Sequence, residues 1–277
     1  MSSSKLTYSS SSVVANLPPE LIDLASRLWT ARRDGGTVDL DAVTLPQTLD
    51  EGYAVQAAVD GACGAAVAAF KIGSSSKASQ EKLGTDEPWF GAVARPFMAE
   101  SGAVVPSAAH TLAVEGEFAF RLSADLPARD SSYAIADVRA AVDRVAPAIE
   151  VVGRRFEGGP EGGAMLPLLV ADGGVNVALV LGQARPFTPD MDFRDHGVVM
   201  RINGAERGRG VGAMALGDPL NSLLWLVNGL SRRGRGLTAG QWVSTGTCTG
   251  IEPAAPGDRA AADFGDLGVV EVALDRR

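Results

Sequence analysis

Three glutamates in two short apolar segments are the residues of this chain most suited to chemistry. Glu115 and Glu117 lie two apart in "AVEGEFAF" (113–120), and Glu150 lies in "VAPAIEVVG" (145–153). Side chains two apart on a strand share a face, so the first pair points away from the face that carries the phenylalanines. A strand with one apolar face usually exposes its charges, which makes a solvated outer face the simplest interpretation of the first segment alone.

Glu150 favours a different interpretation, because its own segment is apolar on both faces. An ionised carboxylate there is costly unless it is paired or bound to a metal. The intervening "SSYAIADVRAAVDRV" (131–145) has a helical pattern, and a strand-helix-strand unit can bring its two strands together in one sheet. Three converging carboxylates repel one another unless they share a cation, and oxygen ligands suit Mg²⁺, Mn²⁺ or Ca²⁺ rather than Zn²⁺. The pattern thus predicts a divalent-cation site on Glu115, Glu117 and Glu150.

Lys71 ends the apolar segment "AAVAAFKIG" (65–73), and two interpretations of it remain open. Its ammonium either reaches solvent past the apolar surface or is partly desolvated with a lowered pKa. In the second case Lys71 is a candidate acid, base or clamp for an anionic substrate. The loop Gly73–Ser76 then offers hydroxyls and N–H groups for a carboxylate, although it equally suits a flexible turn. His110 and His196 are expected to be structural or superficial, since neither has a nucleophile motif to serve.

The elements that position these residues alternate between helical and extended patterns. Helices are predicted at 17–33, 48–63, 131–145 and 218–234, with one helical turn at 77–83. Strands are predicted at 103–105, 112–122, 148–153, 175–182, 196–203, 242–246 and 268–274. The chain is therefore expected to be a β-rich α+β protein with a helical N-terminal extension. A disordered serine-rich tail (1–15) precedes a helical region with the Lys71 strand (16–90) and a β-rich core (91–277), the last two forming one continuous domain.

Composition narrows the functional class. The chain has 277 residues, 46% of them hydrophobic, and a formal net charge of −8. It lacks a basic patch of the size that nucleic-acid binders use, so no nucleic-acid partner is expected. No apolar run approaches the roughly 20 residues of a membrane span, and the N-terminus lacks the apolar core of a secretory signal. The two cysteines have no neighbours at metal-ligand spacing, and a cytoplasmic location is expected.

Five motifs in order resemble the 2-keto-4-pentenoate hydratase and 4-oxalocrotonate decarboxylase branch of the fumarylacetoacetate hydrolase superfamily. The resemblance runs from about residue 50 to the C-terminus. The motifs are "FKIGSSSKASQEKLGTDEPWFG" (70–91), "VEGEFAFRLSADLP" (114–127), "APAIEVVGRRF" (146–156), "GRGVGAMALGDPLNSLLWLVNGL" (208–230) and "LTAGQWVSTGTCTG" (237–250).

The resemblance implies a mixed β-sandwich roll with a divalent metal, usually Mg²⁺ or Mn²⁺, on the three glutamates. It implies catalytic roles for Lys71 and Asp172. It also implies homo-oligomeric assembly, which is decameric in some members. The substrate-binding positions that it implies are Gly73, Ser74, Ser75, Trp89, Thr245 and Gly246.

The implied activity is addition of water to a 2-hydroxy-dienoate or 2-oxo-enoate. Such an acid can bind the metal through its carboxylate and 2-oxygen, so that the cation stabilises an enolate while a placed group moves the proton. Two alternatives stay open: decarboxylation of a 2-oxo-enedioate, in which a similar enolate forms by loss of CO₂, and a diverged homologue without activity.

Some positions depart from the family pattern. Trp89 stands where the hydratases have Asp and the decarboxylases an apolar residue. "ADGGV" (171–175) replaces "ADNAS", and Asp218 replaces the histidine of "LGHPL". No histidine precedes His110, whereas the carbon-carbon hydrolases of the superfamily use one upstream of the metal strand. These differences argue against the hydrolase branch and leave the substrate open.

Overall fold

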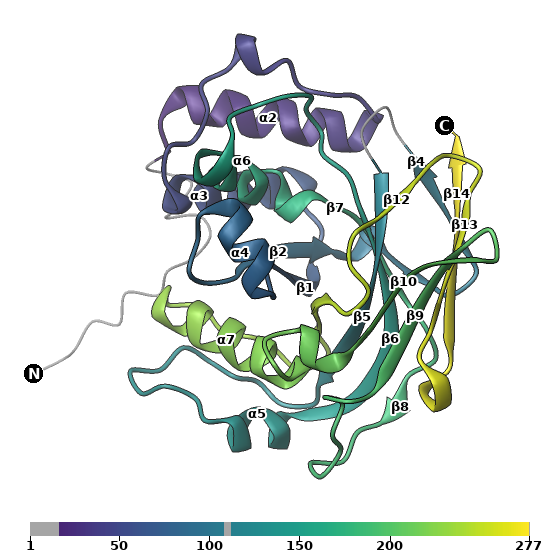
Figure 1. Cartoon of the computed structure of the whole chain (residues 1–277). Coiled ribbons are helices and arrows are strands. Elements are labelled where there is room, and N and C mark those ends of the chain that lie inside the picture. The colour runs from purple at the N-terminus through teal and green to yellow at the C-terminus, as the bar shows by residue number, and fades with distance from the viewer. Residues whose placement is uncertain (1–16, 108–111, 277) are drawn as a thin grey trace, which may run out of the picture.

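The computed structural model describes residues 17–107 and 112–276, in which two β-sheets carry helices along one side and one end (Figure 1). The serine-rich tail and His110 lie outside the described residues, so the predictions for them stay predictions. Among the helices of the described ranges, none has the length and apolar character needed to cross a membrane.

The larger sheet has nine strands and carries the predicted site. Its central order is β2-β1-β11-β5-β6-β7-β3, with β12 paired to β5 and β8 paired to β6. The strands are β1 (Val67–Gly73), β2 (Trp89–Ala94), β3 (Met98–Glu100), β5 (Leu112–Leu122), β6 (Val142–Val152), β7 (Asn176–Leu181), β8 (Arg185–Pro186), β11 (Trp242–Thr247) and β12 (Glu252–Ala254). β1 and β11 run parallel, whereas β5 is antiparallel to both β11 and β6. This order places the Lys71 strand two strands away from β5.

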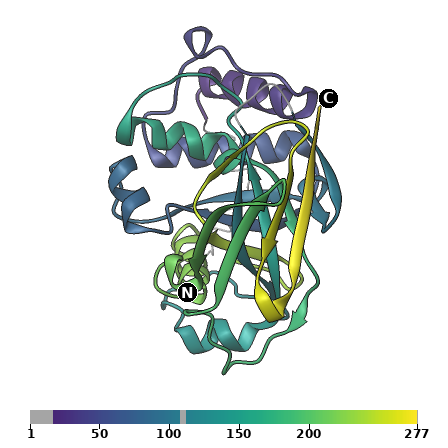
Figure 2. The same ribbon diagram turned by 45° about the vertical axis from the view of Figure 1, so that its right-hand side comes forward.

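A second sheet of five strands, ordered β10-β9-β13-β14-β4, packs across the larger one (Figure 2). Its strands are β4 (Ala103–Ser107), β9 (Gly197–Ile202), β10 (Ala205–Val211), β13 (Arg259–Asp263) and β14 (Val269–Arg276). The main core fills the space between the two sheets. Phe118 and Phe120 point into it from β5, and Phe118 contacts Phe264 edge to face with ring centroids 5.1 Å apart. The apolar face of β5 is therefore the inner face of the sandwich.

Helices cover the remaining surfaces of the larger sheet (Figure 1). α2 (Pro19–Asp34) and α3 (Leu49–Cys63) bury their leucine, valine and alanine stripes in a cluster of their own, which Ala171 of α6 (Leu166–Ala171) joins. A capping box at Thr48 starts α3, because Thr48 Oγ1 accepts from the Glu51 N–H while the Glu51 carboxylate accepts from the Thr48 N–H. The short α4 (Lys77–Leu83) follows β1, and α7 (Pro219–Arg232) packs its leucines into the main core.

Asp218 is the N-cap of α7, where its carboxylate accepts a 2.9 Å hydrogen bond from the Leu220 N–H. It also lies 3.6 Å from the Arg139 guanidinium. A carboxylate is a favoured capping group and is stabilised at a helix N-terminus. The Asp218 departure from the family pattern therefore has a structural reason in this chain.

The predicted helix at 131–145 was wrong in extent. Only α5 (Ile135–Ala141) is helical, and β6 already begins at Val142. Val142 and Val145 fit the helical period, but β-branched residues pack equally well on a sheet, and Pro147 cannot continue a helix. The other three predicted helices are confirmed to within two residues at each end. The strands that were not predicted are β2, β3, β8, β10, β12 and β13; residue 91, the expected start of the β-rich core, lies inside β2.

Candidate active site

The three glutamates come together on the face of the larger sheet that points away from the main core. Glu115 and Glu150 are direct partners across the antiparallel β5–β6 pair, and Glu117 lies two residues further along β5. All three are buried, and one carboxylate oxygen of each lies within 4.8 Å of the others. The solvated-face interpretation of Glu115 and Glu117 is therefore wrong, and the predicted convergence with Glu150 is confirmed.

Clustering and burial work against the charged form of these carboxyl groups. Burial, reinforced by Glu117 and Glu150, raises the pKa of Glu115 well above its ordinary value. Burial and the charge of Glu150 raise the pKa of Glu117 to about 7, and burial also raises the pKa of Glu150. The cluster is thus costly to ionise without a compensating positive charge.

Hydrogen bonds fix one carboxylate oxygen each of Glu117 and Glu150 and leave the other oxygen of each without a hydrogen bond. Glu117 Oε2 accepts from Ser244 Oγ at 2.5 Å and from the Gly246 N–H at 2.9 Å, and Glu150 Oε1 accepts from Asn176 Nδ2 at 2.9 Å. The other oxygens, Glu117 Oε1 and Glu150 Oε2, are buried without a hydrogen bond. These two oxygens and the Glu115 carboxylate form a hard, all-oxygen donor set of the kind that Mg²⁺ or Mn²⁺ takes, and Glu150 Oε2 also has the Lys71 ammonium 3.2 Å away. The residues therefore fit a divalent cation.

Lys71 reaches the same cluster from β1, two strands away. Its Nζ lies 3.2 Å from Glu150 Oε2 and 4.6 Å from the centre of the Trp89 ring, and the side chain is only 3% exposed. Burial by itself lowers the pKa of Lys71, but Glu150, Glu115 and Glu117 outweigh burial and leave that pKa raised. The interpretation that Lys71 reaches solvent is thus wrong, and its desolvation is confirmed. The expected lowering of its pKa is wrong, because the three carboxylates raise that pKa.

The loop after β1 closes the site on the side of Lys71. Ser74 adopts a left-handed backbone conformation with φ of 52°, and its hydroxyl accepts a 2.9 Å hydrogen bond from Trp89 Nε1. Its carbonyl accepts from Gln80 Nε2, which ties the loop to α4. Ser75 lies so close to Gly246 that a Cβ on that glycine would stand 2.1 Å from Ser75 Oγ. The loop is therefore held by specific contacts rather than free to move as a flexible turn.

Trp89 occupies a slot that two glycines leave open. A Cβ on Gly73 would lie 2.3 Å from the indole, and a Cβ on Gly174 would lie 2.8 Å from Trp89 Cζ3 and 3.1 Å from Lys71 Cδ. The backbone of Gly174 also has φ of 67°. The Trp89 and "ADGGV" departures are thus linked, because the tryptophan can lie over Lys71 only where residue 174 has no side chain.

Asp172 lies behind the site rather than in it. Its carboxylate pairs with Arg155, with 2.8 Å between Arg155 Nη1 and Asp172 Oδ1. Arg155 also donates to the backbone carbonyl of Asn176. Arg32 of α2 donates to the same carbonyl at 2.8 Å and to Asn176 Oδ1 at 3.1 Å. Asn176, the residue that holds Glu150, is therefore itself held from both sides.

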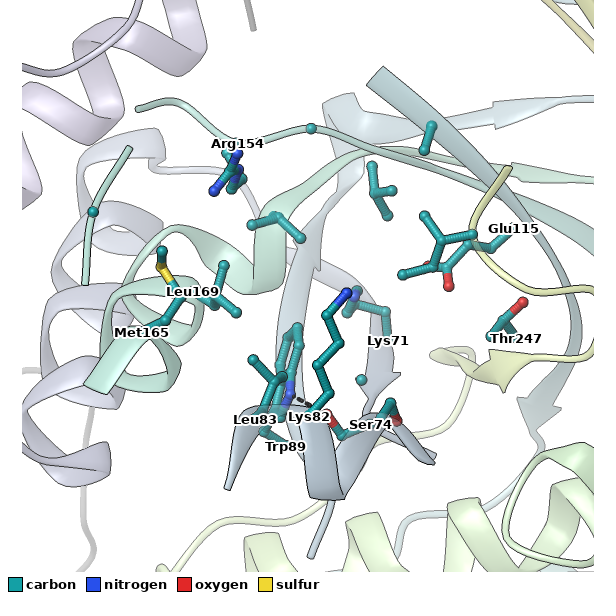
Figure 3. A pocket seen from close by; sticks show the side chains of 18 of the residues that line it. Lys71, Ser74, Lys82, Leu83, Trp89, Glu115, Arg154, Met165, Leu169 and Thr247 are labelled. Atoms are coloured by element: carbon teal, nitrogen blue, oxygen red, sulfur yellow. Dashed lines mark hydrogen bonds between the residues drawn. The ribbon is translucent and has the colours of Figure 1, made fainter. Parts of the chain in front are cut away.

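A cavity of about 730 Å³ opens above Lys71 and Glu115 (Figure 3). Of the predicted substrate-binding residues, Gly73, Ser74, Ser75 and Trp89 line it. Thr245 and Gly246 do not; the Thr245 hydroxyl donates to the Phe118 carbonyl, and the Gly246 N–H donates to Glu117. Sequence reasoning missed Thr247, although it lies next in the quoted motif. It also missed the lining residues Lys82, Arg154, Met165 and Leu169, which no local pattern distinguishes.

Comparison with known proteins identifies the family of this chain. The model of the fumarylacetoacetate (FAA) hydrolase C-terminal family matches residues 63–274. The chain is 30% identical over 264 residues to a 2-keto-4-pentenoate hydratase of Paraburkholderia xenovorans, covering 93% of this chain and 96% of the relative. It is 34% identical over 205 residues to a 4-oxalocrotonate decarboxylase of Pseudomonas putida, covering 74% of this chain and 76% of the relative. This chain belongs to the fumarylacetoacetate hydrolase family.

The fold of this chain is also similar to that of a solved structure from the same branch of the family. The solved structure of 4-oxalocrotonate decarboxylase from Pseudomonas putida G7, complexed with magnesium and adipate, has a TM-score of 0.79 to this chain at 29% identity. The superposition covers 92% of this chain and 97% of that one. The expected fold class and the hydratase–decarboxylase branch are therefore confirmed.

The carboxylate cluster leads to a test of metal binding and pH dependence. A folded-state pKa raised above the unfolded value makes a carboxyl group destabilising once it ionises. Without added metal, we expect the melting temperature to rise as the pH falls from 8 towards 5.5, because Glu117 titrates near 7.

Glu115→Gln should raise the melting temperature at pH 8 by a few degrees and abolish the further rise that Mg²⁺ or Mn²⁺ causes in the wild type. The exposed Glu100→Gln is the control. A cation-induced rise that survives in Glu115→Gln would contradict the site.

The Trp89 slot leads to a second test. Gly174→Ala should lower the free energy of unfolding by about 1–3 kcal/mol, because the new methyl group meets the indole in a backbone conformation that disfavours it. Gly204→Ala is the matched control, since Gly204 has φ of 80° but nothing within 4 Å of its Cβ position. Urea unfolding should show a larger loss at Gly174, of which Trp89→Phe recovers part. Equal losses at the two glycines would contradict the steric link.

The hydrogen bonds of Asn176 lead to a third test, of how Glu150 is positioned. Asn176→Ala should lower stability by about 1–3 kcal/mol and weaken cation binding, because Glu150 Oε1 and Arg32 Nη2 lose their side-chain partner. Asn228→Ala provides the comparison, since Asn228 Oδ1 accepts a 2.7 Å hydrogen bond from the Tyr133 N–H far from the site. It should lose stability while keeping the cation affinity measured by calorimetry. Unchanged cation binding in Asn176→Ala would show that this contact does not position Glu150.

Proposed function

We propose that this chain is a divalent-cation-dependent hydratase that adds water to a 2-hydroxy-dienoate or 2-oxo-enoate. The observation that carries the proposal is the meeting of three buried glutamates with the Lys71 ammonium at the floor of a cavity. The relatives named 2-keto-4-pentenoate hydratase and 2-oxo-hept-4-ene-1,7-dioate hydratase support it, as does the magnesium complexed in the solved decarboxylase structure. We propose Mg²⁺ or Mn²⁺ as the cation and, from the family resemblance alone, a homo-oligomer.

Glu115, Glu117 and Glu150 are the residues that would hold the cation, which when bound supplies Lewis acidity to a chelating 2-oxo acid. One carboxylate oxygen of each glutamate lies within 4.8 Å of the others, and Glu115 alone of the three lines the cavity. Ser244 and Gly246 fix Glu117, and Asn176 fixes Glu150, so the carboxylates need little rearrangement on binding.

Lys71 is the group placed to handle the proton. Its raised pKa keeps it an ammonium, and its Nζ lies in the cavity lining beside Glu150. Ketonisation of a 2-hydroxy-dienoate moves a proton from the 2-hydroxyl to the end of the conjugated system. Water then adds to the remaining double bond, with its oxygen on the carbon β to the ketone and its proton on the α carbon between them. Lys71, or a water that it orients, can donate and take back these protons.

The indole of Trp89 restricts what reaches Lys71. It lies over the ammonium, is held by the hydrogen bond to Ser74, and is itself buried. It excludes water from one side of Lys71 and presents an apolar surface to a substrate. This apolar side chain, at the position where the hydratases have Asp, is the observation that favours the second candidate, a decarboxylase of a 2-oxo-enedioate.

The proposal predicts cation-dependent loss of the ultraviolet absorbance of 2-hydroxy-dienoates in the presence of purified protein. Lys71→Met should lower kcat by about 10²–10⁴-fold while retaining cation binding by calorimetry, since a proton-transfer group and not a ligand is removed. Lys77→Met, on the exposed part of α4, is the control and should keep full activity.

Measurement of CO₂ release beside water addition separates the two reactions. Product that carries a new hydroxyl without release of CO₂ identifies the hydratase, and stoichiometric CO₂ identifies the decarboxylase. Absence of both reactions with cation-loaded protein, over a panel of mono- and dicarboxylic substrates, would overturn the proposal and favour a homologue without activity.

A further inference from the structure

Two cations outside the carboxylate–lysine cluster also line the cavity. Lys71 and Glu115 mark the floor. Lys82 extends into the cavity from α4, and Arg154 lies on the wall just after β6, on the other side of the cavity from Glu115 (Figure 3). Proton transfer and cation binding as proposed above involve neither of these two cations.

Lys82 and Arg154 have no counter-ion in the described part of the chain. Neither takes part in an ion pair or a hydrogen bond there, and the Arg154 guanidinium lies 5.6 Å from the centre of the Phe156 ring. The next residue, Arg155, is by contrast fully engaged with Asp172 and Asn176. One further acid, Glu161, lines the cavity, but it is exposed and pairs with neither cation. Two cationic side chains that face a cavity without a counter-ion can bind an anion there.

We propose that Lys82 and Arg154 form a second anion subsite, and that the substrate is a 2-oxo or 2-hydroxy acid with another carboxylate at its far end. The inference rests on the proposed function and deepens it by naming the substrate class. The first carboxylate and the 2-oxygen face the glutamate cluster, and the second carboxylate faces Arg154 and Lys82.

The separation of the two ends suits a short dicarboxylic acid. Arg154 follows Glu150 by four residues of extended chain, so their Cα atoms are at most about 13 Å apart, and both side chains reduce the gap. The wall between the ends is apolar, as the connecting hydrocarbon of such an acid requires. The apolar residues that line the cavity are Leu83, Trp89, Val152, Met165, Leu169 and Val175.

The two cations differ in what they contribute. Arg154 is half-buried at the cavity wall, and its planar guanidinium can bind a carboxylate through two parallel hydrogen bonds. Lys82 is exposed on a flexible stem, so its attraction is longer in range but is screened by salt. In a chain with net charge −8, such local cations are needed to draw a dianion towards an acidic site.

The test compares two unreactive probes that differ only at the far end. 2-Oxoadipate ends in a carboxylate and 2-oxohexanoate in a methyl group. Calorimetry with Mg²⁺-loaded protein should show 2-oxoadipate binding about tenfold or more tightly, the sum expected of two charged contacts. Arg154→Met and Lys82→Met should each reduce the preference several-fold, and the double variant should abolish it, while the affinity for 2-oxohexanoate stays unchanged.

Lys77→Met, on the same helix but outside the cavity lining, is the matched control and should keep the wild-type preference. A second measurement needs no variant: raising monovalent salt from low to high concentration should weaken 2-oxoadipate more than 2-oxohexanoate. Equal affinity for the two probes in the wild type, or a preference that survives in the double variant, would overturn the subsite alone. Failure of both probes to bind Mg²⁺-loaded protein would overturn the proposed function together with the subsite.

Discussion

The burial of three carboxylates on neighbouring strands is the constraint on which the rest of the site depends. Glu115, Glu117 and Glu150 lie in an environment that disfavours their charge, and each disfavours the charge of the others. A fold keeps such a cluster only when other groups compensate it. The compensation comes from an ammonium, a backbone N–H, a serine hydroxyl and an amide, contributed by β1, β11 and β7. The negative charge that these groups leave uncompensated is what a divalent cation would neutralise.

The compensating groups are held by further layers of contacts. Asn176 donates a hydrogen bond to Glu150 and accepts hydrogen bonds from Arg32 and Arg155. Arg155 in turn donates to the Asp172 carboxylate. A chain of polar contacts thus runs from an N-terminal helix to a carboxylate of the site. Asp172 is three contacts away from Glu150, through Arg155 and Asn176. We therefore interpret Asp172 as a positioning residue rather than one that touches the substrate.

The positions that depart from the family pattern form consistent local structures. Trp89 fits because Gly174 has no side chain, its indole is tied to Ser74, and it lies over Lys71. Asp218 caps α7. The chain has every group of the carboxylate–lysine cluster that the family resemblance implies, in surroundings that depart from it, which is what a shared reaction on a different acid requires. A diverged protein without activity would have no reason to keep the costly cluster, since apolar residues of similar size would be more stable.

The sequence by itself singled out the three glutamates and Lys71 as candidates for the chemistry and placed Glu115 and Glu117 on one face of their strand. The apolar alternation of 112–122 placed Glu115 and Glu117 together, the all-apolar surroundings of Glu150 marked it as unusual, and the motif order identified the family. These signals are local, or are shared with relatives. Only the tertiary structure decided the rest, because strand register and packing join residues far apart in the chain.

The pairing of Glu115 with Glu150 and the reach of Lys71 across β11 follow from the sheet order. The raised pKa of Lys71 reversed the sequence-based expectation, since that pKa depends on three carboxylates brought in by other strands. Lys82 and Arg154 look like ordinary surface cations in the sequence. Their place on the cavity wall depends on how α4 and the end of β6 pack, which no local pattern of residues encodes.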